Sequence, residues 1–443
     1  MNHDEQREHV ETIREVFSYL KQFKDTTFVV KIDYSIVNNP LFSLAVRDLS
    51  LLHEAGIRMA ILPGATGRID EVLATYSVPY RFVDGVRVAG DDAVPFIKMA
   101  AFDVTNRLMT VFAANGVNAV IGNWVRARGI GVIDGVDFQS AGVPESVRAD
   151  TVRKVMEDDI IPVFPCIGWS SVGRPYNISS NELAVMVATT LGAEKLFFIT
   201  SHEGYNAASF AAPQTVPVAP GGRLANFSPT DLDEFFRMNP GKEKELELLA
   251  FARRACASGV ERVHILDGRI EGVILKETFS NLGSGTMVYS NRYGGIRPMT
   301  LHDVSDVLRV MQPFVERGIL LPRTETQLEE SVADFVVFEV DDFVHACAAL
   351  HEYPDGQAEI GGIAVDANFG HLGMGPKLVG FLCERARKKG LAAVFALTTQ
   401  TADWFEKLGF EEKDPSVLPE KKRLTYNLQR KSRVFRKALK QAE

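Results

Sequence analysis

Short apolar, strand-like runs alternate with helical segments as far as Tyr289, and this alternation limits the folds that the chain can adopt. Strands are predicted at Thr27–Ile32, Arg58–Leu62 and Lys195–Thr200, with helices such as Asn181–Leu191 between them. Continuous β-branched runs are typical of parallel strands whose two faces are both buried. The sequence therefore predicts an α/β fold with a largely parallel sheet sandwiched by helices.

The length and charge of the chain exclude several classes of protein. Its 443 residues exceed what one hydrophobic core usually organises, so we expect at least two domains. The formal net charge of -8 argues against a general polyanion-binding protein, and we expect no nucleic-acid partner. The amino-terminal stretch is polar and no apolar run is long enough to span a bilayer, so we expect no membrane partner.

The four cysteines are far apart in the sequence and form no CxxC pair. They are Cys166, Cys256, Cys347 and Cys383. Neither a metal cluster nor a disulfide framework is expected from this spacing. We therefore expect a cytoplasmic protein without a bound metal.

A short polar, glycine-rich segment at Ser290–Gly295 separates two parts of different character. Beyond it, β runs at Phe335–Val340 and Phe343–Leu350 flank two acidic residues, a pattern that predicts a hairpin. We therefore divide the chain into an N-terminal helix (1–25), a larger α/β domain (26–290), a linker (291–295) and a smaller α/β domain (296–443).

A glycine-bearing turn joins a strand predicted at Glu359–Val365 to a helix predicted at Pro376–Lys389. Such a turn can direct several backbone N–H groups at a pyrophosphate, helped by the positive end of the helix dipole. Pro376 suits the first helical position, where a missing N–H matters least. Considered alone, the turn is interpreted equally well as a plain strand–helix connector.

The order of elements around this turn resembles the GNAT superfamily of N-acetyltransferases. In that superfamily the turn binds the CoA pyrophosphate and the preceding strand hydrogen-bonds the pantetheine, so the resemblance implies a GNAT-type domain that uses acetyl-CoA. Gly373 and Gly375 match the superfamily motif, whereas Gly370 stands where Gln or Arg is usual. The implied cofactor-binding residues are Ile363, Ala364, Val365, His371, Gly373, Met374, Gly375 and Lys377.

The segments 395–410 and 418–433 resemble bacterial-type N-acetylglutamate synthases, and this resemblance extends over nearly the whole chain. The second segment carries the pattern Leu-Pro…Lys…Tyr-Asn-x-Gln-Arg-x-Ser. The resemblance implies transfer of the acetyl group of acetyl-CoA to the α-amine of L-glutamate, the first step of arginine biosynthesis. The implied residues are Glu359 and Thr398 for catalysis and Arg323, Asn427 and Arg430 for substrate binding.

The chemistry of acetyl transfer explains these residue types, although each has a structural alternative. The ammonium of glutamate must lose a proton to a base such as Glu359, and Arg is a natural bidentate partner of carboxylates. Strand N–H groups at Ile363–Val365 are expected to stabilise the oxyanion. The alternatives are a solvated strand-edge carboxylate for Glu359, strand packing for Thr398, and a solvated helix face at Arg430–Lys440.

The larger domain resembles the amino acid kinase family, acetylglutamate kinase in particular, in the stretches 29–33, 62–70, 176–184 and 192–196. Active kinases of that family follow the strand lysine with two glycines that cradle the ATP phosphates. Here Lys31 is followed by Ile32 and Asp33, and Asn181 stands where the family has a catalytic Asp. A carboxylate is electrostatically unsuited to a phosphate site, so we expect that this domain has lost phosphotransfer.

A motif between His264 and Thr286 resembles the arginine sensor of arginine-regulated members of that family, which implies L-arginine as an effector. A carboxylate such as Glu277 can pair with a guanidinium, and a glycine loop can expose carbonyl acceptors. The implied arginine-binding residues are Tyr19, His264, Arg269, Glu277, Gly283, Ser284 and Gly285. For His264 and Tyr19 the alternative is a structural role in the core. In the regulated members the N-terminal helix joins subunits into rings, so a homo-oligomer, a hexamer in particular, is implied.

Two other functions stay open from the sequence. One is an acetylglutamate kinase with an acetyltransferase appendage, against which Asp33 and Asn181 argue. The other is a non-catalytic, arginine-binding regulatory protein, which the altered turn at Gly370 leaves open. ATP turnover with acetylglutamate would favour the first, and arginine binding without acetyl-CoA affinity would favour the second.

Overall fold

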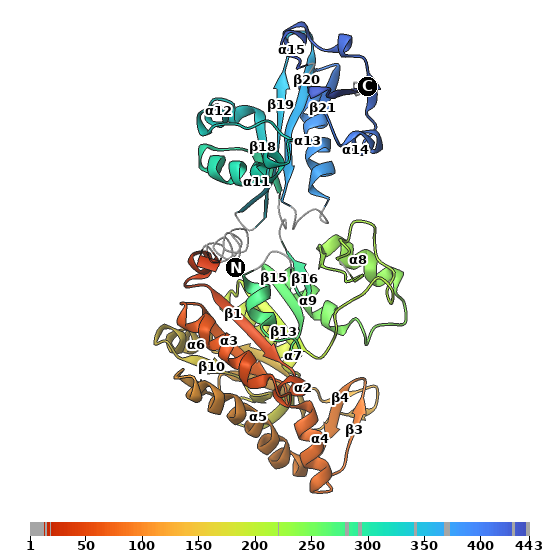
Figure 1. The fold of residues 1–443 in the computed structure, drawn as a ribbon. Coiled ribbons are helices and arrows are strands. Elements are labelled where there is room, and N and C mark those ends of the chain that lie inside the picture. Colours follow the sequence, from red (N-terminus) through yellow and green to blue (C-terminus); the bar gives the residue numbers. More distant parts are fainter. Residues whose placement is uncertain are drawn as a thin grey trace. The chain divides into compact units, whose positions relative to one another are not determined.

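The computed structural model describes residues 13, 16, 17, 19–219, 221–279, 283–290, 295–340, 343–366, 373–427 and 430–439. Its internal contacts divide the chain into two compact units, Met1–Asn291 and Arg292–Glu443 (Figure 1). Residues 291–294 of the predicted linker lie outside the described residues, and Gly295 is the first residue of a strand. Each unit has its own sheet and its own hydrophobic core.

An eight-stranded sheet runs through the described part of the N-terminal unit. Neighbouring strands are parallel except β15 and β16, which are antiparallel. In order across the sheet the strands are β14 (Asn226–Phe227), β16 (Thr286–Tyr289), β15 (Arg262–Asp267), β13 (Lys195–Thr200), β1 (Thr27–Ile32), β2 (Arg58–Pro63), β10 (Ile161–Val163) and β5 (Ala119–Ile121). Every residue of β13 is buried, so both faces of the sheet centre are covered, and the predicted parallel α/β fold is confirmed.

Helices cover this sheet, and two of them begin at the edge where the parallel strands end. The helix α7 packs against β1, β2 and β13, and α9 packs against α7 and β15. The side chain of Ser179 caps α7 by accepting a hydrogen bond from the N–H of Glu182, and Gly192 ends the helix with a φ of 67°. The helices are α2 (Tyr34–Val37), α3 (Phe42–Glu54), α4 (Thr66–Thr75), α5 (Val94–Ala114), α6 (Ala149–Glu157), α7 (Ser180–Leu191), α8 (Pro229–Met238), α9 (Glu247–Ala257) and α10 (Val273–Thr278).

Smaller β elements complete the N-terminal unit. A hairpin follows α4 and consists of β3 (Tyr80–Val83) and β4 (Val86–Ala89). A small closed barrel consists of β6 (Val125–Gly129), β9 (Ala141–Val147), β11 (Ile167–Trp169) and β12 (Pro175–Ile178), and the short strands β7 (Val132–Ile133) and β8 (Val136–Asp137) pair with each other.

The C-terminal unit is built on a seven-stranded sheet among its described residues. Its neighbours are antiparallel except β20 and β21, which are parallel. The predicted hairpin is confirmed as β18 and β19, and its turn at residues 341–342 lies outside the described residues. In order the strands are β17 (Gly295–Pro298), β18 (Phe335–Val340), β19 (Phe343–Glu352), β20 (Gln357–Val365), β21 (Ala393–Thr398), β23 (Arg433–Ala438) and β22 (Glu411–Lys413).

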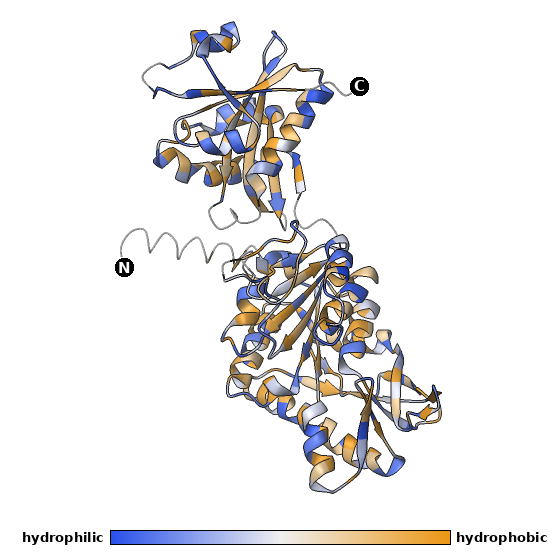
Figure 2. Ribbon diagram, turned by 90° about the vertical axis from the view of Figure 1, so that its right-hand side faces the viewer, coloured by the Kyte–Doolittle hydropathy of each residue, from blue (hydrophilic) through white to orange (hydrophobic). Residues whose placement is uncertain are grey.

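Alternation along β18 shows how this second sheet is covered. Phe335 and Val337 pack in one apolar cluster with α11, while Val336 and Phe338 pack in another with α13. Because successive strand residues point to opposite faces, the two helices cover opposite faces of the sheet. Figure 2 shows hydrophobic residues concentrated along the strands of both units. The helices are α11 (Val304–Glu316), α12 (Glu325–Glu330), α13 (Met374–Lys388), α14 (Ala402–Lys407) and α15 (Glu420–Leu424).

Two local predictions in the C-terminal unit are wrong. The basic stretch expected as a helix face at Arg430–Lys440 contains the strand β23, in which Val434 and Phe435 are buried on opposite faces of the sheet. The helix α13 begins at Met374, so Pro376 is its third residue rather than its first. The N–H that Pro376 lacks would have had no partner within the helix in either position.

Candidate active site and effector site

The strands β20 and β21 separate in the middle of the C-terminal sheet. They are paired only at Gln357 with Ala393, Ala358 with Val394, and Glu359 with Phe395, although β20 continues to Val365. Beyond Glu359, one edge of β20 therefore has no partner strand among the described residues. Backbone N–H and C=O groups along such an edge can bind an extended ligand.

The predicted cofactor residues Ile363, Ala364 and Val365 lie on this separated part of β20. On its other edge β20 stays paired with β19, where Ala364 faces Cys347 and Val365 faces Ala346. The backbone polar groups on the open edge, rather than the buried side chain of Ala364, are what these residues can offer to a ligand.

A β-bulge that sequence analysis missed lies just before these residues. The register between β19 and β20 shifts between Cys347 and Ala349, and Gly362 has a φ of 61°. A Cβ at Gly362 would lie 3.3 Å from Cε1 of Phe335. Two successive glycines at 361 and 362, inside a strand pattern, are the sequence signal that predicts such a bulge.

The glycine turn leads into the 15-residue helix α13. Gly373 is its N-cap with a φ of 62°, and Gly375 is buried, with a Cβ there expected 3.1 Å from the ring of Trp404. The side chain of Met374 is part of the core, so only its backbone N–H can serve a ligand, while Lys377 is exposed in the first turn. His371 lies outside the described residues. A helix N-terminus with close-approach glycines fits a phosphate group.

Glu359 stands at the last paired position before the strands separate. Its side chain is 12% exposed, and Nζ of Lys422 lies 2.8 Å from Oε1 and 2.6 Å from Oε2. The hydroxyl of Tyr353 donates to Oε2 at 3.1 Å. Burial and the neighbouring carboxylate of Glu359 raise the pKa of Tyr353, so this phenol stays protonated. The alternative of a solvated strand-edge carboxylate is therefore wrong for Glu359.

Arg323 lies near the same carboxylate, immediately before α12. Its guanidinium is 3.4 Å from Nε2 of His351 and stacks 5.1 Å above the ring of Phe335. Nδ1 of His351 is 2.6 Å from Oδ2 of Asp334, and His351 faces Glu359 across β19 and β20. Burial lowers the pKa of Arg323, and the charge of Glu359 opposes that shift. The sequence did not single out His351, Asp334, Tyr353 or Lys422.

Arg430 and Asn427 hold the segment that leads to Arg323. The guanidinium of Arg430 donates to the carbonyl oxygens of Ile319 at 2.6 Å and Gly318 at 3.2 Å. The backbone N–H of Arg430 donates to Oδ1 of Asn427 at 3.3 Å. These contacts tie the loop after α15 to the loop after α11, and they use Nη2 of Arg430 within the protein.

Thr398 closes the end of β21. Its hydroxyl is 2.7 Å from the hydroxyl of Thr401, and Oγ1 of Thr398 accepts from the N–H groups of Gln400 at 3.3 Å and Thr401 at 3.0 Å. Thr398 is buried, and these bonds give its hydroxyl a structural task in the turn before α14.

The N-terminal unit brings the arginine-sensor residues together beside β15. His264 and Glu277 are both buried, and Nδ1 of the histidine is 2.7 Å from Oε1 of the glutamate. The backbone N–H groups of Ser284 and Gly285 donate to Oε2 of Glu277. Burial alone would raise the pKa of Glu277, but the hydrogen bonds from His264 and the two N–H groups outweigh it and lower that pKa to about 2. Burial lowers the pKa of His264, so we assign Nδ1–H as the donor to an ionised Glu277.

The glycine loop differs from expectation because a side chain of the protein occupies it. The guanidinium of Arg223 donates to the carbonyl oxygens of Gly283, at 2.8 Å, and of Gly285. The carbonyls that we expected to be open to a ligand are thus used internally. Gly283 itself has a φ of 54°, which favours glycine at this position.

Tyr19 and Arg269 lie at the margins of this cluster. A series of ring contacts leads from Tyr19 through Phe23, Phe28 and Phe197 to His264, with neighbouring centroids 4.9 to 6.0 Å apart. The described residues 19–23 are therefore packed onto the core that holds the histidine. Arg269 is exposed and its guanidinium pairs with Asp267 and Glu203.

Within the described ranges, no group of three or more His, Cys, Asp or Glu side chains is placed to hold a metal ion. No helix in the described part of the chain is both long and apolar enough to cross a membrane. All four cysteines are buried and free.

The sequence matches the amino acid kinase family over residues 26–206 and the acetyltransferase (GNAT) family over residues 304–410. An amino-acid acetyltransferase of Ralstonia nicotianae is 32% identical, covering 98% of this chain and 96% of that protein. The corresponding protein of Ectopseudomonas mendocina is 31% identical, covering 98% and 100%.

Two crystal structures of N-acetylglutamate synthase from Neisseria gonorrhoeae are similar to this chain at 29% identity. The complex with coenzyme A and L-arginine has a TM-score of 0.81 and covers 97% of this chain and 99% of that one. The complex with coenzyme A and N-acetyl-glutamate has a TM-score of 0.60 and covers 98% and 99%. The predicted fold class and acyltransferase class are confirmed, and the chain belongs to the amino-acid acetyltransferase family.

Proposed function

We propose that the C-terminal unit transfers the acetyl group of acetyl-CoA to the α-amine of L-glutamate, and that the N-terminal unit binds L-arginine as a regulator. The gonococcal synthase binds coenzyme A, N-acetyl-glutamate and L-arginine, and its likeness to this chain covers both units. The reaction yields N-acetyl-L-glutamate and CoA.

The observation that carries the proposal is the separation of β20 from β21 directly after Glu359. The open edge of β20 offers N–H and C=O groups to an amide-containing chain, and α13 offers its N-terminus to phosphate. Acetyl-CoA supplies an activated thioester acyl group. Ile363, Ala364, Val365, Gly373, Met374, Gly375 and Lys377 are the described residues that would hold it.

Glu359 is suited to receive the proton that the glutamate ammonium must lose. Its two contacts, from Lys422 and Tyr353, come from side chains, which can change partner when a substrate arrives. Arg323 is half-buried, and a guanidinium in a site of low dielectric constant attracts a carboxylate more strongly than one in water. We assign Arg323 to a substrate carboxylate, and Arg430 with Asn427 to holding the adjoining loop.

The effector site is assigned to the cluster around Glu277. Nε2 of His264 and Oγ of Ser284 are buried and have no hydrogen-bond partner among the described residues. Buried polar atoms of this kind are costly unless a ligand or water satisfies them. They lie beside an ionised carboxylate, which supports a cationic ligand such as L-arginine.

Assembly and location are part of the same proposal. We expect a homo-oligomer, a hexamer in particular, formed through the N-terminal helix. Ile13 and Phe17, one helical turn apart, are 53% and 67% exposed, which supports an apolar contact with another subunit. Four free cysteines support a reducing cytoplasm.

The test is thiol release from acetyl-CoA on the full chain with L-glutamate, in parallel with and without L-arginine. We expect release that depends on glutamate and changes when arginine is added. Release without an arginine response would remove the effector assignment alone. Absence of glutamate-dependent release would overturn the assigned reaction.

A further inference from the structure

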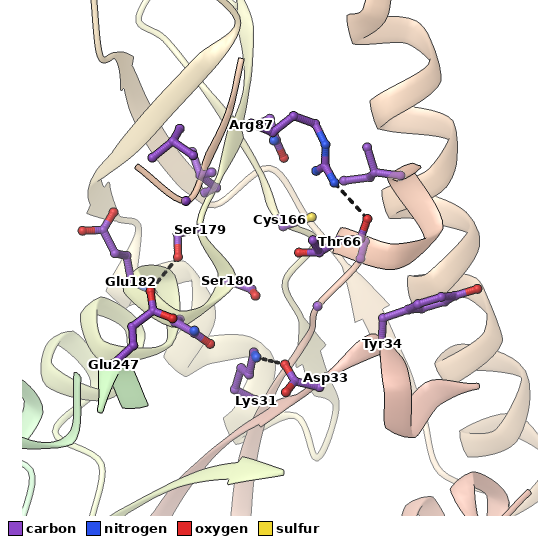
Figure 3. A pocket seen from close by; sticks show the side chains of 18 of the residues that line it. Lys31, Asp33, Tyr34, Thr66, Arg87, Cys166, Ser179, Ser180, Glu182 and Glu247 are labelled. Carbon is purple, nitrogen blue, oxygen red and sulfur yellow. Dashed lines mark hydrogen bonds and ion pairs between the residues drawn. The ribbon is translucent and has the colours of Figure 1, made fainter. Parts of the chain in front are cut away.

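A cavity of about 690 Å³ lies in the N-terminal unit, in a position that neither acetyl transfer nor the arginine site uses. It opens at the carboxyl ends of β1 and β2, between the hairpin β3–β4 and the first residues of α7 and α9 (Figure 3). Cavities of this size at the ends of parallel strands are common ligand sites.

The side of the cavity next to β1 is unsuited to polyphosphate. Lys31 is buried, and its ammonium is already paired with the carboxylate of Asp33. The ring of Tyr34 lies so close to Gly67 that a Cβ there would be 2.6 Å from Cδ1 of the ring. The hydroxyl of Tyr34 donates to Glu71 at 3.0 Å. An incoming phosphate would therefore meet a carboxylate and a phenol ring instead of an open glycine loop.

Two polar atoms in the cavity wall have no hydrogen-bond partner among the described residues, namely Nε of Arg87 and Oδ1 of Asn181. Arg87 is 5% exposed, its ring neighbours are Tyr80 and Phe82, and its Nη2 donates to Asp70 at 2.5 Å. The wall thus presents one buried donor and one buried acceptor. A ligand that satisfies both must itself carry an acceptor and a donor.

The charges around the cavity indicate what kind of ligand would carry such an acceptor and donor. The lining contains two cationic side chains, and both are internally paired, Lys31 with Asp33 and Arg87 with Asp70. It also contains four carboxylates, Asp33, Asp84, Glu182 and Glu247. Glu182 has Arg254 at 3.6 Å, whereas Glu247 is exposed at the start of α9. The cavity is therefore acidic overall and favours a cationic ligand.

We propose that this cavity binds a basic α-amino acid. The carboxylate of the ligand accepts a hydrogen bond from Nε of Arg87, and its ammonium groups face Asn181, Glu182 and Glu247. Figure 3 shows Arg87 on one side of the cavity and the two glutamates on another. Free nucleotides are disfavoured because their phosphates would face Asp33.

The experiment is calorimetric titration of the full chain with L-lysine. The substitution Glu247→Gln removes one unshielded carboxylate and should weaken the binding of L-lysine about tenfold. Asn181→Leu, which removes the acceptor, should weaken it as well. Glu245→Gln is the matched control, since Glu245 is also exposed, two residues away, and does not line the cavity. Ser284→Ala, in the effector site, should leave lysine binding unchanged.

Two analogues test the two ends of the ligand separately. Cadaverine lacks the carboxylate of lysine and 6-aminohexanoate lacks the α-amine, so each should bind more weakly than L-lysine. Failure of L-lysine to bind, or equal binding to the original chain and to Glu247→Gln, would overturn the proposal. Tighter binding of Mg-ATP than of L-lysine would overturn it too, because the cavity would then still suit phosphate. Each of these results is independent of thiol release in the other unit.

Discussion

Glu277 in the N-terminal unit is buried and Glu359 in the C-terminal unit is partly buried, and each is a carboxylate at a candidate site whose donors differ in kind. Glu277 accepts hydrogen bonds from a histidine ring and two backbone N–H groups. Glu359 accepts from Lys422 and Tyr353, which are both side chains. Backbone donors cannot rotate away, so Glu277 is a fixed anion. Glu359 can exchange its partners, as a group that receives a proton must.

A left-handed glycine lies beside each carboxylate. A Cβ at Gly283, whose φ is 54°, would lie 3.7 Å from both oxygens of Glu277. Gly362, whose φ is 61°, forms the bulge three residues after Glu359. In both units a left-handed glycine turn lies near the acid, and the two sites differ in what the turn provides. The loop of Gly283 brings N–H donors to its carboxylate, whereas the bulge redirects the strand that runs on toward α13.

The largest expected effect concerns Glu359. If it is the base, Glu359→Gln should lower kcat by about 10²–10⁴-fold, because a positioned general base typically contributes that much. The measurement is steady-state thiol release at saturating acetyl-CoA and glutamate across pH. The variant should also lose the acidic limb of the pH profile that the carboxylate produces.

Glu352→Gln is the matched control for that variant. Glu352 lies on the neighbouring strand β19, is 43% exposed and pairs with Lys389, so its loss should leave kcat unchanged. An unaltered kcat and pH profile in Glu359→Gln would make Glu359 a structural partner of Lys422. Glu277 and Glu359 would then differ only in their hydrogen-bond donors and not in their task.

The next prediction concerns Glu277, the fixed anion, and the response of its unit to acid. The pKa of Glu277 is lowered from an ordinary value of 4.5 to about 2. The resulting stabilisation of the N-terminal unit is present above pH 4.5 and is lost as the pH falls toward 2. Chemical unfolding of the original chain at pH values from 6 down to about 2.5 should show this loss, and Glu277→Gln should remove that part of the pH dependence.

An unchanged pH dependence in Glu277→Gln would mean that other groups cause the acid response. Asp303 in the C-terminal unit, whose pKa is lowered to about 2 by Arg297, is the first of these to examine. Fluorescence of Trp124 and Trp169, compared with that of Trp404, distinguishes the two units because each unit contains its own tryptophans.

Local sequence patterns predicted the frame of each site but not the partners of the charged groups. The strand that carries Glu359 near its start and the helix that follows the glycine turn are visible as short-range patterns. Lys422, in contrast, lies 63 positions from Glu359, and Arg223 lies 60 positions from Gly283. No local periodicity encodes a contact across such a separation. It is fixed only when the sheets bring distant segments together.

The strand β23 shows the same limit for secondary structure. Its adjacent residues Val434 and Phe435 are both buried because β23 lies between β21 and β22 with apolar clusters on both faces. Two neighbouring apolar residues among basic ones follow neither the strand period nor the helix period. The basic charges alone therefore favoured the prediction of a solvated helix. Pairing with the distant strands β21 and β22 makes this segment a strand.

A smaller effect tests whether the two glycine turns tolerate a side chain equally. Gly283→Ala and Gly362→Ala each force a side chain into the left-handed region, at a cost of about 1–2 kcal/mol. Gly362→Ala should be the more destabilising, because its Cβ would also lie 3.3 Å from the Phe335 ring. Urea unfolding measures the stability. We expect Gly283→Ala to alter the arginine response but not kcat, and Gly362→Ala to alter kcat. A change of kcat in Gly283→Ala, with an altered arginine response in Gly362→Ala, would contradict the roles given to the two turns.

The smallest effect concerns Thr398, a neutral acceptor in the same unit as Glu359. Thr398→Val keeps the shape of the side chain but removes the oxygen that accepts from the N–H groups of Gln400 and Thr401. Loss of such a local cap should destabilise the unit by about 1 kcal/mol. Since the hydroxyl is already committed to the turn, kcat of the folded variant should change little. A fall in kcat of Thr398→Val at unchanged stability would instead assign the hydroxyl to the reaction, so that the open end of β21 as well as that of β20 would contact the reacting groups.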